Sequence, residues 1–94
     1  METRTKTTVF ELGQIVATPG ALESIPAEDI ADALGRHQRG DWGGVCEDDR
    51  KENEFSLGKH LRLFSVYHAE EGTKFWIITE ADRSATTILL PEEY

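Results

Sequence analysis

The spacing of apolar residues changes once along this chain, from a helical repeat in residues 26–39 to a strand-like repeat after His60. In the first segment, one face recurs every three or four positions, as on an α-helix: Ala27, Ile30, Ala31, Leu34 and His37. Pro26 before this face and Gly40 after it are typical helix boundaries. We therefore predict a helix over residues 26–39.

Three strands are predicted after His60. Residues 61–68 alternate with a period of two, and residues 74–79 form a short, nearly continuous apolar run that is typical of a central strand. Residues 86–90 form the third strand, which Pro91 ends. Because the connections are short, the three strands should form an antiparallel meander.

The remaining segments are less regular. We expect a flexible tail at residues 1–7, followed by a strand within residues 8–17 that Gly13 interrupts, with a bulge there. Pro19-Gly20 predicts a turn and at most one helical turn after it. A second, largely exposed helix of about ten residues fits within residues 45–57, with Gly58 at its end.

This order of elements predicts an α+β fold with a single domain over residues 8–94. An N-terminal strand and helices come first, and the three-stranded antiparallel meander then packs on the helix of residues 26–39. A chain of 94 residues can form one hydrophobic core but not two. Cys46, the only cysteine, cannot form an internal disulfide, so the fold must depend on packing.

The charge of the chain restricts its partners. Asp and Glu outnumber Lys and Arg by 18 to 10, which gives a formal net charge of -8. Nucleic-acid affinity depends on basic contacts to phosphate, so we expect no direct binding to nucleic acid. No apolar run approaches the roughly 20 residues of a membrane span, and the N-terminus leads into no signal-peptide core. We expect a cytoplasmic protein without membrane contacts.

The candidate partner-binding residues are a group of acids and two possible anchors. The acids Glu47, Asp48, Asp49 and Glu52 would project from one helix and could attract a basic protein groove, or could form a solvated helix face. Trp42, between glycines, either fills the edge of the core or anchors an interface. Arg83 could hold a carboxylate or phosphate, although Asp82-Arg83-Ser84 also fits a plain turn with side-chain to backbone bonds.

The histidines have structural explanations. His37 stands at the C-terminal end of the predicted helix, where the helix dipole favours its charged form. His60 and His68 flank a strand and should face solvent. A zinc site from Cys46 and the histidines would lack the usual ligand spacing, so we expect no metal and no cofactor.

Two segments carry a resemblance to a known family. Residues 40–43 read GDWG, and residues 75–94 read FWIITEADRSATTILLPEEY. With the polar helix between them, they resemble a family of short, mostly uncharacterised proteins carried by phages, plasmids and integrated elements in bacteria, over about residues 9–94. The resemblance implies a mobile-element setting, in which small acidic proteins are often antagonists of host defence, including anti-CRISPR proteins. The order of elements also resembles, more weakly, the barnase-like and RelE-like ribonuclease fold of toxins.

Three functions follow as hypotheses. The first is a non-enzymatic inhibitor that binds a host protein, such as a nucleic-acid-handling defence complex, through Trp42, Glu47, Asp48, Asp49, Glu52 and Arg83. The second is a ribonuclease toxin or a degenerate relative, which needs a general base, a general acid and a cation. Its candidates are Glu11 or Glu80, then His37, His60 or His68, and Arg62 or Arg83. The third is a homo-oligomer, such as a homodimer, assembled through an exposed sheet edge or apolar patch.

Overall fold

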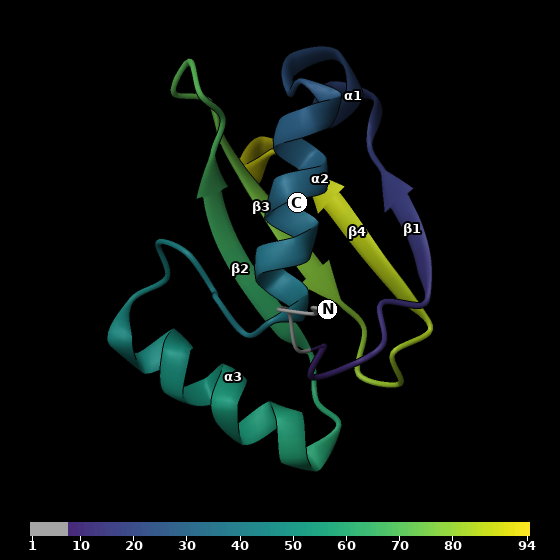
Figure 1. Cartoon of the computed structure of the whole chain (residues 1–94), viewed down its shortest axis with the longest axis vertical. Helices are drawn as coiled ribbons and strands as arrows, with labels where there is room; N and C mark the ends of the chain where they lie inside the picture. Colours follow the sequence, from purple (N-terminus) through teal and green to yellow (C-terminus); the bar gives the residue numbers. More distant parts are fainter. Residues whose placement is uncertain (1–7) are drawn as a thin grey trace, which may run out of the picture.

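The structure, a computed structural model of the chain, describes residues 8–94, so the tail predicted for residues 1–7 lies outside the described residues. Four strands form one sheet in the order β1-β4-β3-β2 (Figure 1). Along the chain the elements are β1 (Gln14–Ala17), α1 (Pro19–Ser24), α2 (Ala27–Gln38), α3 (Glu47–Lys59), β2 (Leu63–His68), β3 (Lys74–Thr79), β4 (Ala85–Leu89) and the 3₁₀ helix η1 (Pro91–Glu93). The predicted α+β class is confirmed.

The sheet is mixed, which corrects the prediction of a purely antiparallel sheet. β2, β3 and β4 form the predicted antiparallel meander, and β1 adds to β4 in parallel. The N-terminal strand covers only four residues of the predicted 8–17. At Gly13 the chain has a φ of 67°, and a Cβ there would lie 2.4 Å from the carbonyl oxygen of Arg83. Gly13 therefore marks a close crossing over the β3–β4 turn rather than a bulge.

The two longer helices follow the sequence with one correction. α2 starts directly after Pro26, as predicted. α3 does not end at Gly58 but continues to Lys59, because the left-handed residue that ends it is His60, at φ 56° and ψ 53°. The N–H of His60 bonds to the carbonyl of Ser56 and closes the last turn.

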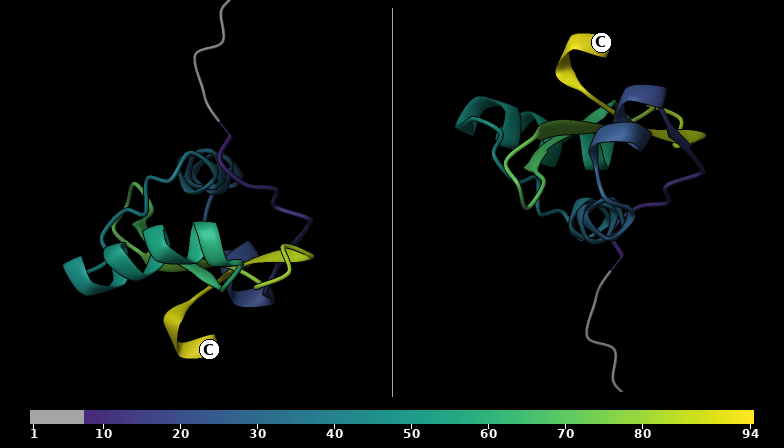
Figure 2. Two further views of the ribbon diagram at one scale, coloured as in Figure 1. Left: turned by 90° about the horizontal axis from the view of Figure 1, so that it is seen from below. Right: turned by 90° about the horizontal axis from the view of Figure 1, so that it is seen from above.

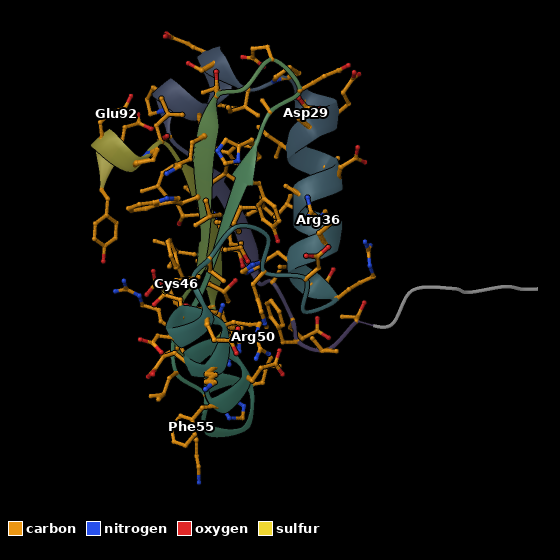
Figure 3. The ribbon with its side chains drawn as sticks, turned by 90° about the vertical axis from the view of Figure 1, so that its left-hand side faces the viewer. Asp29, Arg36, Cys46, Arg50, Phe55 and Glu92 are labelled. Carbon is orange, nitrogen blue, oxygen red and sulfur yellow. The ribbon has the colours of Figure 1, made fainter. Side chains whose placement is uncertain are left out.

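One face of the sheet carries the core. α2 lies across this face, and η1 lies on the opposite side of the sheet (Figures 2 and 3). Ala33 of α2 and Ile25 before it pack with the buried side chains of β3 and β4, among them Phe75, Ile77 and Ile88. The face turned away from α2 is here called the open face, and among residues 8–94 no α-helix lies across it (Figure 2).

Within residues 8–94, no helix is long and apolar enough to cross a membrane.

Candidate binding site on the open face

The open face contains a hollow of about 300 Å³. It lies where α3 approaches the sheet from one side and the end of the chain approaches it from the other. The hollow is lined by residues of α3, β2 and β3, by the residue before β2 and by the residue after η1. These residues are Asp49, Glu52, Asn53, Arg62, Phe64, Trp76, Ile78 and Tyr94. The hollow therefore combines an apolar floor with charged groups at its rim.

Aromatic rings form one wall of the hollow. The Trp76 ring, half-buried on β3, meets Phe64 at a centroid distance of 5.0 Å and Tyr94 at 5.6 Å, in both cases edge to face. Arg62 Nη2 donates to the Tyr94 hydroxyl at 2.6 Å, and its guanidinium lies 5.8 Å from the centre of that ring. Tyr94, which is 68% exposed, is thereby held beside Trp76 instead of pointing freely into solvent.

Asn53 fixes the position of α3 against the sheet. Its side-chain amide forms both hydrogen bonds to the backbone of Phe64: Oδ1 accepts from N–H at 3.0 Å, and Nδ2 donates to the carbonyl at 2.6 Å. Asn53 is 2% exposed, so its two hydrogen bonds continue the backbone pairing of the sheet beyond β2 inside the protein. Asp49 lies one turn before Asn53 and three residues before Glu52, and both carboxylates belong to the helix face that lines the hollow.

The structure divides the predicted acidic group into two parts. Asp49 and Glu52 line the hollow, and within residues 8–94 neither forms an ion pair. Glu47 and Asp48 are exposed outside the hollow. Glu47 pairs with Arg50 at 2.5 Å on the helix surface, and this contact lowers the pKa of the Glu47 carboxyl. Only half of the predicted patch therefore faces a concave surface.

Trp42 is not at the surface. It is 3% exposed, so of the two alternatives that the sequence left open, it fills the edge of the core. Its ring stacks on Phe10 at 6.2 Å and meets His37 edge to face at 5.6 Å. Its indole N–H donates to the Glu54 carboxylate at 2.8 Å. A partner could not reach this ring without opening the core.

Arg83 is engaged with the backbone of its own chain. It has a φ of 62°, and its guanidinium donates to four carbonyl oxygens, those of Ser56, Leu61, Glu80 and Ala81, at 2.7–3.1 Å. These contacts join the end of α3, the segment before β2 and the β3–β4 turn. The Ser84 N–H bonds to Asp82 Oδ1 at 3.0 Å, as the turn interpretation predicts. Arg83 lies outside the lining of the hollow.

We expect Arg83→Gln to destabilise the fold by about 2–3 kcal/mol, because a charged donor is lost while carbonyls at a helix end lose their partner. The measurement is urea unfolding followed by circular dichroism. Arg39→Gln removes the same charge from an exposed position and serves as the control. Equal unfolding midpoints for the two variants would show that the carbonyl contacts contribute nothing.

Arg83 contacts the backbone of Glu80 and of Leu61, which stands between His60 and Arg62, but within residues 8–94 no hydrogen bond or ion pair joins the side chains of the candidate ribonuclease residues to one another. His37 is fully buried, whereas His60, which precedes β2, and His68, its last residue, are exposed, as predicted. Arg62 and Arg83 hold Tyr94 and the backbone, respectively. Among the described residues there is also no group of three or more His, Cys, Asp or Glu that could hold a metal ion, and Cys46 is a free, exposed thiol.

The prediction that His37 is stabilised in its charged form is wrong. The ring meets both Phe10 and Trp42 edge to face, with Nδ1 2.5 Å from Ser65 Oγ and Nε2 2.9 Å from Thr79 Oγ1. Burial, and secondarily the charge of Arg83, lowers its pKa to about 3. The ring is therefore neutral at pH 7, and the packing of its aromatic neighbours closes it off from substrates.

Sequence reasoning missed most of the apolar part of the hollow. Phe64, Ile78 and Tyr94 were not singled out, although one signal for the first two was present. The β3 segment is apolar on both sides, and the single helix α2 can cover only one of them. The position of Tyr94 depends on how η1 turns after Pro91, which the residue pattern does not specify.

No family model matches this chain, and searches among curated proteins and among solved structures gave no significant match.

Proposed function

We propose that the protein acts by binding another protein, and that the hollow on the open face accepts a basic segment of this partner. One observation carries the proposal: Asp49 and Glu52, two carboxylates without ion-pair partners among the described residues, line the same hollow as the half-buried Trp76 ring and the exposed Tyr94 ring. A partly enclosed site with negative charge and aromatic rings suits the side chain of arginine or lysine.

Three physical effects favour a cationic occupant. The faces of Trp76 and Tyr94 attract a cation through the quadrupole of each ring, and they cover its aliphatic stem. The two carboxylates supply charge-assisted hydrogen bonds at the rim. The net charge of -8 attracts a basic surface from a distance. Arg62 opposes these effects only in part, because Tyr94 holds its guanidinium at one side of the hollow.

Basic segments are a common property of proteins that handle nucleic acids, because they contact phosphate. We therefore propose as partner a host nucleic-acid-handling protein, such as a defence complex, and as function its inhibition. The resemblance of residues 75–94 to a family from mobile elements supports this direction, which would make the protein an anti-defence factor of the anti-CRISPR kind. A basic segment of the partner that is bound in the hollow would no longer be available to the partner's nucleic acid.

The proposal can be tested with a short arginine-glycine peptide and the fluorescence of Trp76. In a Trp42→Phe variant, Trp76 is the only tryptophan, so its emission reports on the hollow. We expect a saturable change that weakens as salt is added. Asp49→Lys/Glu52→Lys in this background should weaken binding by about tenfold or more, since two attractive contacts become repulsive.

Glu47→Lys/Asp48→Lys is the matched control, because it changes the net charge by the same amount outside the hollow. It should weaken binding by much less than the hollow variant. Equal loss in the two double variants would mean that net charge alone attracts the peptide and that the hollow is not the site. Affinity capture from a nuclease-treated bacterial lysate with the same variants would then identify the partner by mass spectrometry.

A further inference from the structure

Within the part of the chain that the structure describes, the outer edge of β1 has backbone groups without a partner. The N–H groups of Gln14 and Thr18 bond to the carbonyls of Ser84 and Ile88 in and after β4, at 2.9 and 3.0 Å. Since successive residues of a strand point in opposite directions, the residues between them, Ile15 and Ala17, turn N–H and C=O away from the sheet. No described element lies beyond β1 (Figure 1).

At the opposite edge of the sheet, formed by β2, other segments of the same chain bond to the strand backbone. At β2, the loop after α2 pairs with Val66: the Val66 N–H donates to the Trp42 carbonyl at 3.1 Å, and the Gly44 N–H donates to the Val66 carbonyl at 2.8 Å. Asn53 covers the backbone of Phe64 in the same way. Among residues 8–94, the fold thus satisfies one edge with its own residues and leaves the other without a backbone partner.

The β1 edge also lacks the protection that exposed strands usually have. Proteins guard such edges with charges, with prolines inside the strand or with bulges. β1 contains none of these, and the nearest charged residues in the sequence are Glu11 and Glu23. The Glu93 carboxylate lies just beyond the strand, where it accepts hydrogen bonds from Thr18 and Gly20. Ile15 is 46% exposed and Val16 41% exposed, on opposite faces of the strand. An unguarded, apolar edge of this kind indicates an interface.

Charge indicates which chain occupies it. Two copies of a protein with a net charge of -8 repel each other over most of their surfaces, and residues 12–22 are a stretch where neither copy carries charge. A basic partner, in contrast, would find no carboxylate on β1. We propose that β1 pairs antiparallel with β1 of a second copy, so that the protein forms a two-fold symmetric dimer with one continuous sheet.

The backbone geometry selects one register. Pairing centred on Val16 sets Ile15 of one copy opposite Ala17 of the other, and each such pair exchanges both backbone hydrogen bonds. A register centred on Ile15 would bring Ala17 opposite Gly13, which has a φ of 67° and lies outside the strand. A register centred on Ala17 would bring Ile15 opposite Pro19, which has no N–H.

Centring on Val16 also produces a suitable packing. Large Ile15 faces small Ala17 on the side of α2, and the two Val16 side chains meet on the open face, with Cα atoms about 4.5 Å apart. Because the two-fold axis runs perpendicular to the sheet, both hollows face the same side of the dimer. A four-residue strand gives a small interface, below about 1,200 Å², so the dimer should be weak and should depend on concentration.

Disulfide trapping tests the register directly. In a Cys46→Ser background, which removes the native thiol, Val16→Cys is incubated with oxidised glutathione and analysed by non-reducing electrophoresis. The expected Cα separation suits a disulfide, so we expect a covalent dimer, formed at least about tenfold faster than with Ile15→Cys or with the exposed Glu92→Cys. Mixing Ile15→Cys with Ala17→Cys should give a heterodimer that forms faster than the homodimer of either variant.

If Val16→Cys cross-links no faster than Glu92→Cys, the proposed pairing is wrong. If Ile15→Cys alone cross-links fastest, the register is wrong.

Light scattering provides an independent measurement on the wild-type chain. Dimerisation should increase with salt, because screening reduces the repulsion between two acidic copies, whereas binding of the basic peptide should decrease. Val16→Asp should abolish the dimer and leave both the circular dichroism spectrum and the Trp76 response to the peptide unchanged. The proposed dimer and the proposed binding at the hollow can therefore be disproved separately.

A different result would overturn the dimer. In that case the wild-type protein stays monomeric at all concentrations and salts, and Val16→Asp abolishes the capture of a partner, which would assign the β1 edge to that partner.

Discussion

Acidification from pH 7 to pH 5 is expected to lower the free energy of unfolding by about 2 kcal/mol through His37 alone. The pKa of His37 falls from 6.5 in the unfolded chain to about 3 in the fold, mainly because the ring is buried. Below pH 6.5, His37 is therefore protonated in the unfolded chain and still neutral in the folded chain. The stability that comes from the neutral His37 is complete above pH 6.5 and is lost as the pH falls to about 3, with a limiting slope of about 1.4 kcal/mol per pH unit.

Urea unfolding at several pH values measures this slope. His37→Gln keeps a polar group at the site but removes the titration, so its stability should change less between pH 7 and pH 5, although the variant is less stable at pH 7. His68→Gln removes an exposed histidine and should retain the wild-type slope. The fold also lowers the pKa of four carboxyls. Their protonation reduces the stability mostly below pH 5, outside the range measured here; they are Asp41, Glu47, Asp82 and Glu93. Parallel pH profiles for wild type and His37→Gln would contradict the assignment.

Gly43→Ala is expected to destabilise the fold by roughly 3 kcal/mol or more. Gly43 has a φ of 73°, which a side chain rarely adopts. A Cβ there would lie 2.0 Å from the carbonyl oxygen of Val66 and 2.8 Å from the ring of Tyr67. The loop must move away from β2, and the contacts that close this edge of the sheet are then lost.

Gly44→Ala provides a control at the next position. A Cβ on Gly44 would meet nothing closer than 3.9 Å, so we expect its stability to stay within about 1 kcal/mol of wild type. Thermal or urea unfolding of the two variants separates a local steric effect from a general sensitivity of the loop. Similar losses for both would indicate that flexibility of the loop, and not the contact with Val66, is what the glycines provide.

The elements that depend on local patterns were predicted well. The helical repeat of residues 26–39 and the apolar run of residues 74–79 gave α2 and β3 with nearly the observed bounds, because each element buries a face that its own sequence defines. The parallel pairing of β1 with β4 joins residues about seventy positions apart. No local pattern specifies which edge a short N-terminal strand will join, so the mixed sheet could not be foreseen.

The candidate site was predictable only in part, for a related reason. The acids of α3 were visible as a group, but whether each one faces the sheet depends on Asn53, which fixes the rotation of the helix through its two bonds to Phe64. Arg83 and Trp42 looked suitable for binding because of their residue types. Both are instead used inside the molecule, where Arg83 meets carbonyls from three separate segments and Trp42 packs beside His37.

The carbonyl of Leu12 determines the direction of a row of hydrogen bonds that reaches the ring of His37. It can only accept a hydrogen bond, so the Thr86 hydroxyl, 2.7 Å away, must donate to it. Thr86 must then accept from Thr79, at 2.7 Å, and Thr79 in turn accepts from the Nε2–H of His37. Nδ1 is left to accept from Ser65. One backbone oxygen before β1 thus selects the tautomer of a histidine in α2, and every O–H and N–H dipole of the row points from β2 toward the N-terminal segment.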